Sequence, residues 1–191
     1  MNSQASTERK VTFAINVTLD GYTDHTVGIV DNELHDFFTR QLDDADLLLF
    51  GRVTFQMMES YWPHAESDSE STESEKMFAK KFNALPKIVF SQTIQKTEWN
   101  NSRIMRGNLV EEVLKLKKQP GKDISAGSIS IFQELMRHNL IDEYWLVVHP
   151  LLCKKGKHLF DGINNTINLT LVDTKTFASG VVVLHYLKNN E

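Results

Sequence analysis

Short apolar segments alternate with segments of helical period along most of the chain, and this alternation restricts the fold more than any other feature. Runs of β-branched and other apolar residues predict strands at Val11–Leu19, Leu47–Phe50, Lys87–Phe90, Asp123–Ala126 and Tyr144–His149. Between these runs, apolar residues recur at helical spacing and predict helices over residues 32–43, 54–61, 78–82 and 108–118, with a further helix after residue 128. Strands separated by helices favour parallel pairing, because each helix carries the chain back to where the previous strand began.

The last part of the chain has a different pattern. Two further strands are predicted over residues 167–172 and 181–186, and a short connection containing Ala178-Ser-Gly180 separates them. Adjacent strands joined so briefly must be antiparallel. Together, the two patterns predict an α/β fold with a mixed, mostly parallel sheet that is flanked by helices and ends in a hairpin.

Length and composition predict one domain. A chain of 191 residues can bury one substantial core, and no repeat or Pro/Gly-rich linker divides it. We expect residues 1–9 to be a flexible N-terminus and residues 10–191 to form the domain. Serine and carboxylate side chains dominate residues 64–76, and we expect a mobile acidic loop there because this segment has little to bury.

Charge and hydropathy argue against several classes of protein. A formal net charge of −4 is not that of a general nucleic-acid binder. No apolar run approaches the roughly 20 residues that span a bilayer, and the opening MNSQASTERK has no apolar signal core, so we expect a cytoplasmic protein without membrane contact. Cys153 is the only cysteine and the histidines lack ligand spacing, so neither an internal disulfide nor a metal site is predicted.

Small and polar residues follow three of the predicted strands. They are Gly51, Arg52 and Thr54 after one strand, Ser91 and Thr93 after the next, and Gly127 and Ser128 after a third. Parallel strands deliver their carboxyl ends to the same side of a sheet, where ligands of open α/β folds bind. Helix-start N–H groups, a guanidinium and hydroxyls are all donors to phosphate oxygens. The pattern alone leaves two interpretations, a site for a phosphate-bearing cofactor and a set of ordinary turns.

An ordered series of motifs carries a family resemblance. The chain contains, in this order, Val17-Thr-Leu-Asp-Gly21, Leu49-Phe-Gly-Arg-Val-Thr-Phe55, Tyr61-Trp-Pro63, Lys87-Ile-Val-Phe-Ser-Gln-Thr93, Leu140-Ile-Asp-Glu-Tyr144, Val148-His-Pro150 and Gly156-Lys-His-Leu-Phe160. The series resembles the stand-alone proteins of the dihydrofolate reductase-like superfamily, which are related to the C-terminal reductase domain of the bifunctional riboflavin-biosynthesis deaminase-reductase. The resemblance extends from about Lys10 to Leu187. It implies a three-layer sandwich around a mixed sheet of about eight strands.

The resemblance also implies NADPH as the cofactor. Gly51, Arg52 and Thr54 match the helix start that takes the cofactor's phosphates. Ser91, Gln92 and Thr93 match the strand end beside the adenine ribose, where relatives often carry an arginine at the position of Gln92.

The remaining cofactor residues lie in two other segments. Ala126, Gly127, Ser128 and Ile129 match the segment that relatives place against the pyrophosphate, where they often have a Gly-Gly pair. The turn of Asp20 and Gly21 falls beside the nicotinamide.

By the same resemblance, the activity is reduction of a small heterocycle, a pterin or a ribosylaminopyrimidine related to 5-amino-6-(5-phosphoribosylamino)uracil. Three side chains are candidates for proton transfer, namely Asp20, Glu33 and His35, of which the last two lie in the helix that carries the catalytic carboxylate of dihydrofolate reductases. A homodimer is expected from the family, and the shared face of Tyr144, Leu146 and Val148 is its predicted contact. Two alternatives stay open. One is a degenerate member that binds a nucleotide or small ligand without turnover, which Gln92 and Ser128 favour; the other is a purely structural dimer module.

Overall fold

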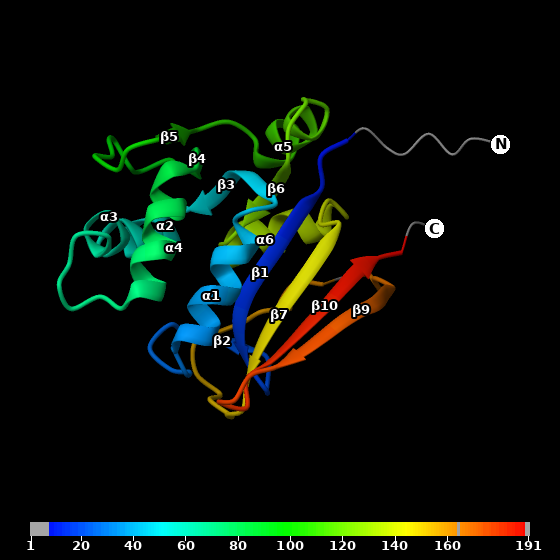
Figure 1. Ribbon diagram of the computed structural model, residues 1–191. Coiled ribbons are helices and arrows are strands. Elements are labelled where there is room, and N and C mark those ends of the chain that lie inside the picture. Colours follow the sequence, from blue (N-terminus) through cyan, green and yellow to red (C-terminus); the bar gives the residue numbers. More distant parts are fainter. Residues whose placement is uncertain (1–7, 164, 190–191) are drawn as a thin grey trace.

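Eight strands form the central sheet of the computed structural model, which describes residues 8–163 and 165–189 (Figure 1). The strands lie in the order β5-β4-β3-β6-β1-β7-β10-β9. Their bounds are β1 Val11–Thr18, β3 Ala45–Gly51, β4 Lys87–Phe90, β5 Ser102–Met105, β6 Asp123–Ala126, β7 Glu143–His149, β9 Leu169–Thr176 and β10 Val182–Lys188. A separate short pairing joins β2 (Tyr22–Thr23) to β8 (Lys157–His158).

The direction of the strands gives the sheet two different rims. From β5 to β7, neighbouring strands are parallel, and the antiparallel hairpin of β9 and β10 completes the sheet beside β7. The parallel strands therefore all end on one side, called here the carboxyl rim, and all begin on the opposite side, the amino rim. The predicted mixed, mostly parallel sheet with a final hairpin is confirmed.

Helices cover both faces of the sheet (Figure 1). α1 (Asn32–Gln41) and α4 (Glu73–Ala84) lie on one face, and α5 (Leu109–Lys117) and α6 (Ile129–Arg137) lie on the other. Side chains of a strand alternate between the two faces. In β3, Leu47 and Leu49 accordingly pack in the core beneath α5 and α6, whereas Leu48 and Phe50 pack in the core beneath α4.

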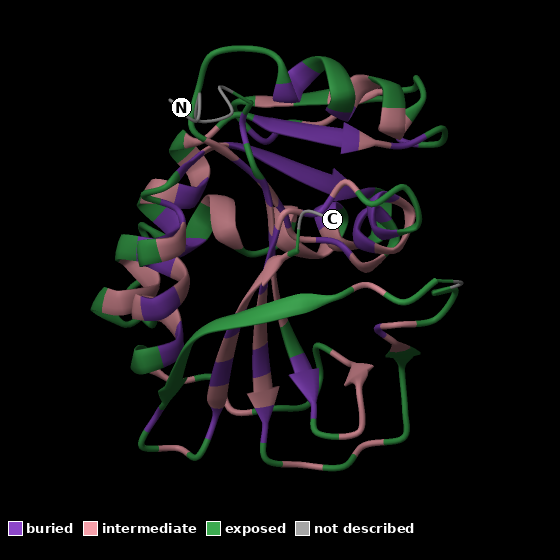
Figure 2. Cartoon of the chain, turned by 90° about the vertical axis from the view of Figure 1, so that its right-hand side faces the viewer, coloured by how far each residue is buried: buried purple, intermediate pink, exposed green. Residues whose placement is uncertain are grey.

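The hairpin end of the sheet is covered less well. Every residue of β9 is exposed (Figure 2). On the face shared with α6, β7 and β10 contribute the partly exposed Leu146, Val148 and Tyr186, and β9 adds Leu171, which is 50% exposed. This part of the domain therefore presents an apolar sheet face to its surroundings.

The loop in the acidic segment, predicted over residues 64–76, is shorter than predicted. The single turn α3 (Trp62–Ala65) follows α2 (Arg52–Glu59), and α4 begins at Glu73. Thr72 and Glu75 start α4 with a capping box, in which each side chain accepts a hydrogen bond from the other residue's backbone N–H. Carboxylates are favoured at that position by the helix dipole. The expected helix over residues 78–82 is thus the middle of a longer helix whose acidic start looked like loop sequence.

Other details of the structure also differ from the prediction. α2 begins at Arg52 rather than at Thr54, and β5 was not predicted at all. Arg9 is 8% exposed, its guanidinium pairs with Asp46, and its Nε donates to Lys122 O at 2.6 Å, so residue 9 belongs to the folded domain. The other residues of the predicted flexible N-terminus lie outside the described part of the chain, except Glu8.

Candidate functional site

Four neighbouring strands end side by side at the carboxyl rim. β4, β3, β6 and β1 are adjacent and parallel. β4, β3 and β6 end at nearly the same level, since Gly51 is in register with Phe90 and Leu49 with Ala126. The three strand ends that the sequence grouped into one site are therefore neighbours. β1 runs further, because Phe13 is in register with Ala126, and the turn of Asp20 and Gly21 lies beyond the end of β6 on the same side of the sheet.

Two helices begin at this rim without a side-chain cap. Gly51 is the N-cap residue of α2 and has no side chain, and Ser128 is the N-cap residue of α6 but does not cap its own helix. By contrast, α1, α4 and α5 are capped by Asp31, Thr72 and Asn108. The first N–H groups of α2 and α6 are unpaired donors at the positive ends of two helix dipoles, and they can hold negatively charged groups.

A direct contact fixes these two helix starts to each other. The Gly51 N–H donates to Ser128 Oγ at 2.9 Å, and Ser128 is only 1% exposed. A Cβ on Gly51 would collide with Ser130 Oγ, so the chain needs glycine here for close approach. The Ser128 hydroxyl accepts this hydrogen bond inside the junction and does not face solvent. A direct contact with a phosphate would require a hydroxyl that does face solvent. Ala126 is buried beside it, and Ile129 is half-buried.

Arg52 supplies an exposed cation at the same place. It is the first residue of α2, and its Nη1 donates to Gln56 Oε1 at 3.1 Å. Within the described part of the chain it has no carboxylate partner. Thr54 lies in the same first turn and is half-buried. The positive charge of Arg52 is therefore available to a ligand at the rim.

The loop after β4 is held by its own hydroxyl and by a distant arginine. Ser91 Oγ accepts hydrogen bonds from the N–H groups of Thr93 and Ile94, at 3.2 and 3.1 Å. Arg106 follows β5 and donates from Nη1 to Gln92 O at 2.9 Å and from Nη2 to Ile94 O at 3.0 Å. In return, Gln92 Nε2 donates to Arg106 O at 2.9 Å. Arg106 was not among the predicted site residues, because only the parallel pairing of β4 with the unpredicted β5 brings it beside Gln92.

Asp20 joins two loops at the rim. Its carboxylate accepts from the Thr18 hydroxyl at 2.6 Å and from the N–H groups of Cys153 and Lys154 at 3.2 and 2.9 Å. These hydrogen bonds, chiefly that of Thr18, lower the pKa of Asp20. Gly21 has φ +84° and packs against His158. Hydrogen bonds from three donors stabilise the ionised form of this carboxylate, so it is a poor proton donor. The geometry instead favours a structural role for Asp20, in which it holds the two loops together.

The two candidates in α1 face different surroundings. Glu33 Oε2 accepts from Ala178 N at 2.8 Å and so ties α1 to the β9–β10 connection. The His35 ring lies 6.0 Å from the Trp62 ring and 6.4 Å from the Phe78 ring, between α1 and the α3–α4 region. Its burial lowers the pKa of His35, so the ring is neutral near pH 7. Of the three predicted proton-transfer residues, only His35 has a side chain without a hydrogen bond inside the described residues.

A buried histidine fixes the segment that leads into α1. His149 is 3% exposed; its Nδ1 accepts from Ile29 N at 3.1 Å, and its Nε2 lies 3.1 Å from Asn16 Oδ1. Nδ1 is therefore the unprotonated nitrogen, and Nε2 donates to the amide oxygen. These two contacts give His149 a structural role, in which it joins the segment before α1 to β1.

Four apolar side chains near strand ends and helix starts are exposed. Leu19 follows β1, Val30 precedes α1, Val53 is in the first turn of α2, and Leu152 follows β7; each is about two-thirds exposed or more, from 66% to 73%. Val53 lies beside the first N–H groups of α2, and apolar surface next to such donors suits a ligand with both a flat ring and an anionic part.

At the opposite, amino rim, polar side chains are paired with one another. Asp46 pairs with Arg9, Asp142 with Lys117, and Glu143 with His185 at 2.6 Å. Each of these pairs includes a side chain that is no more than 11% exposed. This rim consequently has few free donors for a ligand.

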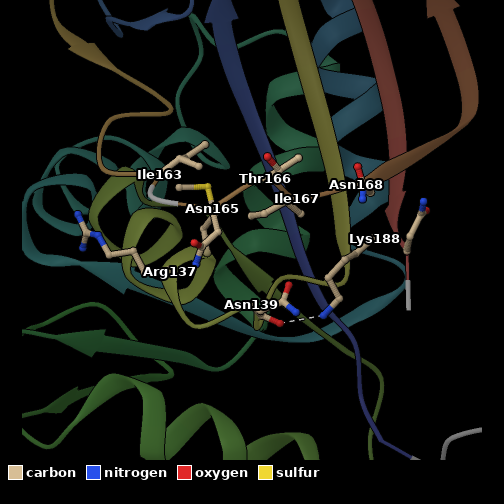
Figure 3. Close-up of a pocket in the computed structure, with 10 residues that line it drawn as sticks. Arg137, Asn139, Ile163, Asn165, Thr166, Ile167, Asn168 and Lys188 are labelled. Carbon is tan, nitrogen blue, oxygen red and sulfur yellow. Dashed lines mark hydrogen bonds between the residues drawn. The ribbon is translucent and has the colours of Figure 1, made fainter. Parts of the chain in front are cut away.

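A cavity near the amino rim lies away from the predicted site. It has a volume of about 360 Å³ and lies between the end of α6, the segment before β9 and the end of β10 (Figure 3). Its two cations are already engaged, since Arg137 donates to Glu134 at 2.9 Å and Lys188 donates to Asn139 O at 2.8 Å. Size alone would favour this cavity as a ligand site, but unpaired donors and exposed apolar groups are at the carboxyl rim.

Residues 8–163 and 165–189 contain no helix long and apolar enough to cross a membrane. Nor do they contain a group of three or more His, Cys, Asp or Glu residues placed to hold a metal ion.

Comparisons with known proteins agree with the fold. The chain is 37% identical over 183 residues to the uncharacterized protein YyaP of Bacillus subtilis, covering 94% of this chain and 95% of that protein. A crystal structure of a putative riboflavin biosynthesis protein from Shewanella sp. PV-4 superimposes with a TM-score of 0.73 at 18% identity, over 95% of this chain and 99% of the other. The deaminase and 5-amino-6-(5-phosphoribosylamino)uracil reductase of Thermotoga maritima superimposes with a TM-score of 0.64 at 15% identity, over 95% of this chain and 57% of that longer one.

The family follows from the sequence match rather than from these distant folds. The model of the RibD C-terminal domain matches residues 9–183, which is nearly the whole chain. The chain belongs to the RibD C-terminal domain family, whose reductase-like fold it shares.

Proposed function

We propose that this protein is an NADPH-dependent reductase of a small heterocycle, of the pyrimidine or pterin type. The observation that carries the proposal is the pair of uncapped helix starts, α2 and α6, locked together at Gly51 and Ser128 beside the exposed Arg52. Family membership supports an oxidoreductase that uses a nicotinamide cofactor. The cofactor supplies the hydride, and the chain binds and orients both partners.

The cofactor residues divide into three groups. The first turns of α2 and α6 would hold the pyrophosphate through backbone N–H groups, with Arg52 contributing charge. Ser91, Gln92 and Thr93 would lie along the adenine ribose, and Gly21 would lie beside the nicotinamide. The hydrogen bond from the Gly51 N–H to Ser128 Oγ fits this arrangement, since it holds the two helix starts at fixed positions relative to each other.

The substrate would lie next to the nicotinamide, between the start of α1 and the start of α2. Val30 and Val53 offer apolar contact to a heterocycle there. We propose His35 as the residue that holds or delivers a proton, because Asp20 and Glu33 are occupied by backbone N–H groups. His35→Gln should then slow NADPH oxidation without changing NADPH affinity; an equal loss of affinity would show that the ring acts only through packing.

Titration calorimetry of the purified protein with NADPH tests the cofactor step. Saturable binding is expected, and no heat at millimolar NADPH would contradict the proposal. Turnover is tested by following loss of NADPH absorbance with dihydropterins, dihydrofolate and aminopyrimidine ribosides, with and without a 5′-phosphate.

A second candidate function is ligand binding without turnover. It is favoured by the occupied carboxylates of Asp20 and Glu33 and by Gln92 and Ser128 at positions where relatives differ. NADPH affinity with no oxidation across the substrate panel would support this function over catalysis.

We also propose that the protein forms a homodimer through the apolar sheet face of Leu146, Val148, Leu171 and Tyr186. This face is partly exposed although its residues are apolar, and burying it against a second copy would remove that surface from water. Light scattering after size-exclusion chromatography should give a dimer for the wild type and a monomer for Leu171→Lys. A monomeric wild type would contradict this proposal and leave the cofactor site unaffected.

A further inference from the structure

We propose that Arg106 selects NADPH over NADH by binding the 2′-phosphate of the adenine ribose. This inference rests on the proposed cofactor site and names a residue for one group of that cofactor. The family resemblance implies an arginine after the serine that follows β4, and this chain has the uncharged Gln92 there. The neighbouring strand supplies the missing cation from a position 14 residues further along the chain.

The pairing of β4 with β5 places Arg106 at the ribose loop. Phe90 is in register with Met105, and the Ser91 N–H donates to Met105 O at 3.1 Å. Ser91 and Arg106 are therefore the next residues of two paired strands, and both leave the sheet at the carboxyl rim. The reciprocal bonds between Arg106 and Gln92 hold the guanidinium there.

The guanidinium keeps both charge and donors for a ligand. It bonds to the carbonyls of Gln92 and Ile94 and, at 3.5 Å, to Gln95 Oε1. These three bonds leave two of its five N–H groups. No carboxylate lies within ion-pair distance of Arg106 in the described residues, whereas Arg103 on the same strand is paired with Glu112 and Lys96 with Glu98.

The surroundings suit a phosphate monoester. Gln92, Thr93 and Arg106 are all exposed, so an incoming group can reach the guanidinium. Ser91 Oγ uses its lone pairs for two backbone N–H groups and retains its own hydrogen as a donor. The Nε–H and one Nη1–H remain as donors, and an arginine held by backbone carbonyls presents its charge and these two donors to a phosphate at a fixed position. NADH, which has a hydroxyl in place of this phosphate, would gain little from the contact.

The test is the ratio of NADPH to NADH affinity, measured by calorimetry for the wild type and for Arg106→Gln. We expect the wild type to prefer NADPH, and we expect the variant to lose about 10- to 100-fold in NADPH affinity with NADH affinity unchanged. The matched control is Arg103→Gln, which removes an arginine of the same strand that already has a carboxylate partner. Titration with 2′,5′-ADP and 5′-AMP should show the same preference and the same loss, since only the first has the 2′-phosphate.

Two outcomes distinguish a direct contact of Arg106 with the 2′-phosphate from a role in holding the loop after β4. If Arg106 only holds the loop, Arg106→Gln should weaken NADPH and NADH equally, and that result would overturn the inference. In the double variant Gln92→Arg/Arg106→Gln, a cation returns to the neighbouring position, and the preference for NADPH should recover in part. A wild type that binds both nucleotides equally overturns this inference alone, whereas a wild type that binds neither overturns the proposed function with it.

Discussion

The two rims of the sheet are built from different chemistry. At the amino rim, buried or half-buried polar side chains meet partners inside the fold, as in the ion pairs of Arg9 with Asp46 and Lys117 with Asp142 and the hydrogen bond between His185 and Glu143. At the carboxyl rim, the strands end in glycine and hydroxyl residues, two helices start without side-chain caps, and Arg52 and Arg106 have no carboxylate partner among the described residues. One rim satisfies its polar groups internally, and the other leaves them for a ligand.

This difference indicates which contacts serve stability and which serve function. Breaking an internal pair at the amino rim should unfold the protein more easily and leave cofactor affinity intact in the folded molecules. Substitutions at the carboxyl rim should lower cofactor affinity and leave stability unchanged. A cavity of about 360 Å³ lies near the amino rim, so the comparison also predicts that the presence of a cavity does not locate the cofactor here.

The largest expected effect is on stability, from Asp142→Ala at the amino rim. Asp142 Oδ2 accepts from Val11 N at 2.8 Å and pairs with Lys117, whose side chain is 11% exposed. Removing the carboxylate leaves that lysine unpaired, and the free energy of unfolding in urea should fall by about 4 kcal/mol. The exposed pair of Lys96 and Glu98 provides the control, because Glu98→Ala should cost less than about 1 kcal/mol. Equal losses in the two variants would contradict the described difference in burial.

Lys87 is the exception at the amino rim, because it is buried without a carboxylate. It is 1% exposed, its Nζ donates to Asn83 O and Leu85 O, and the Trp99 ring centroid lies 4.6 Å away. Burial lowers the pKa of Lys87 to about 8. The unfolded chain therefore holds this proton more tightly than the folded one, so stability rises as pH increases from about 8 to the ordinary lysine value.

The wild type and Lys87→Met make this pH dependence measurable. Relative to the variant, the wild type should gain about 3 kcal/mol in unfolding free energy across that pH window. Urea titrations at several pH values give the difference. A difference that does not change with pH would mean that Lys87 titrates normally.

Arg52→Ala is the matching test at the carboxyl rim. We expect NADPH affinity to fall by about 1 to 3 kcal/mol, the range of a hydrogen bond to a charged group, with the urea midpoint unchanged because Arg52 is exposed. Arg137→Ala serves as the control, since Arg137 lines the large cavity at the amino rim. Loss of NADPH affinity in the Arg137 variant, and not in the Arg52 variant, would reverse the roles of the two rims.

The smallest expected effect is from Glu33→Ala. Its carboxylate accepts one hydrogen bond, from Ala178 N, at an exposed position, so stability should fall by about 1 kcal/mol. The rate of NADPH oxidation should not change in steady-state assays with an accepted substrate. A large drop in rate would contradict this expectation and indicate that Glu33 takes part in proton transfer.

The fold was largely predictable because it depends on local patterns. β-Branched runs, helical periods and the short connection before β10 specified the strands, the helices and the hairpin. β5 was missed because Ser102–Met105 is short and only partly buried. The start of α4 was missed because its capping box lies within serine and glutamate residues that resemble a loop.

The candidate site was predictable only in part. The clustering of Gly51, Ser91 and Gly127 followed from the rule that parallel strands end together. The contacts of individual side chains did not, because Asp20 bonds to Cys153 and Lys154, and Arg106 bonds to Gln92, across long stretches of sequence. Such pairings come from strand register and loop packing, which no local pattern specifies.

The central claim is that the carboxyl rim binds the cofactor, and backbone amide NMR shifts during NADPH titration test it most directly. The account predicts saturable shifts largest at the starts of α2 and α6 and in the loop after β4, with little change at Arg137, Asn165 and Lys188. Shifts that gather around those three residues, or no saturable shifts at all, would contradict it.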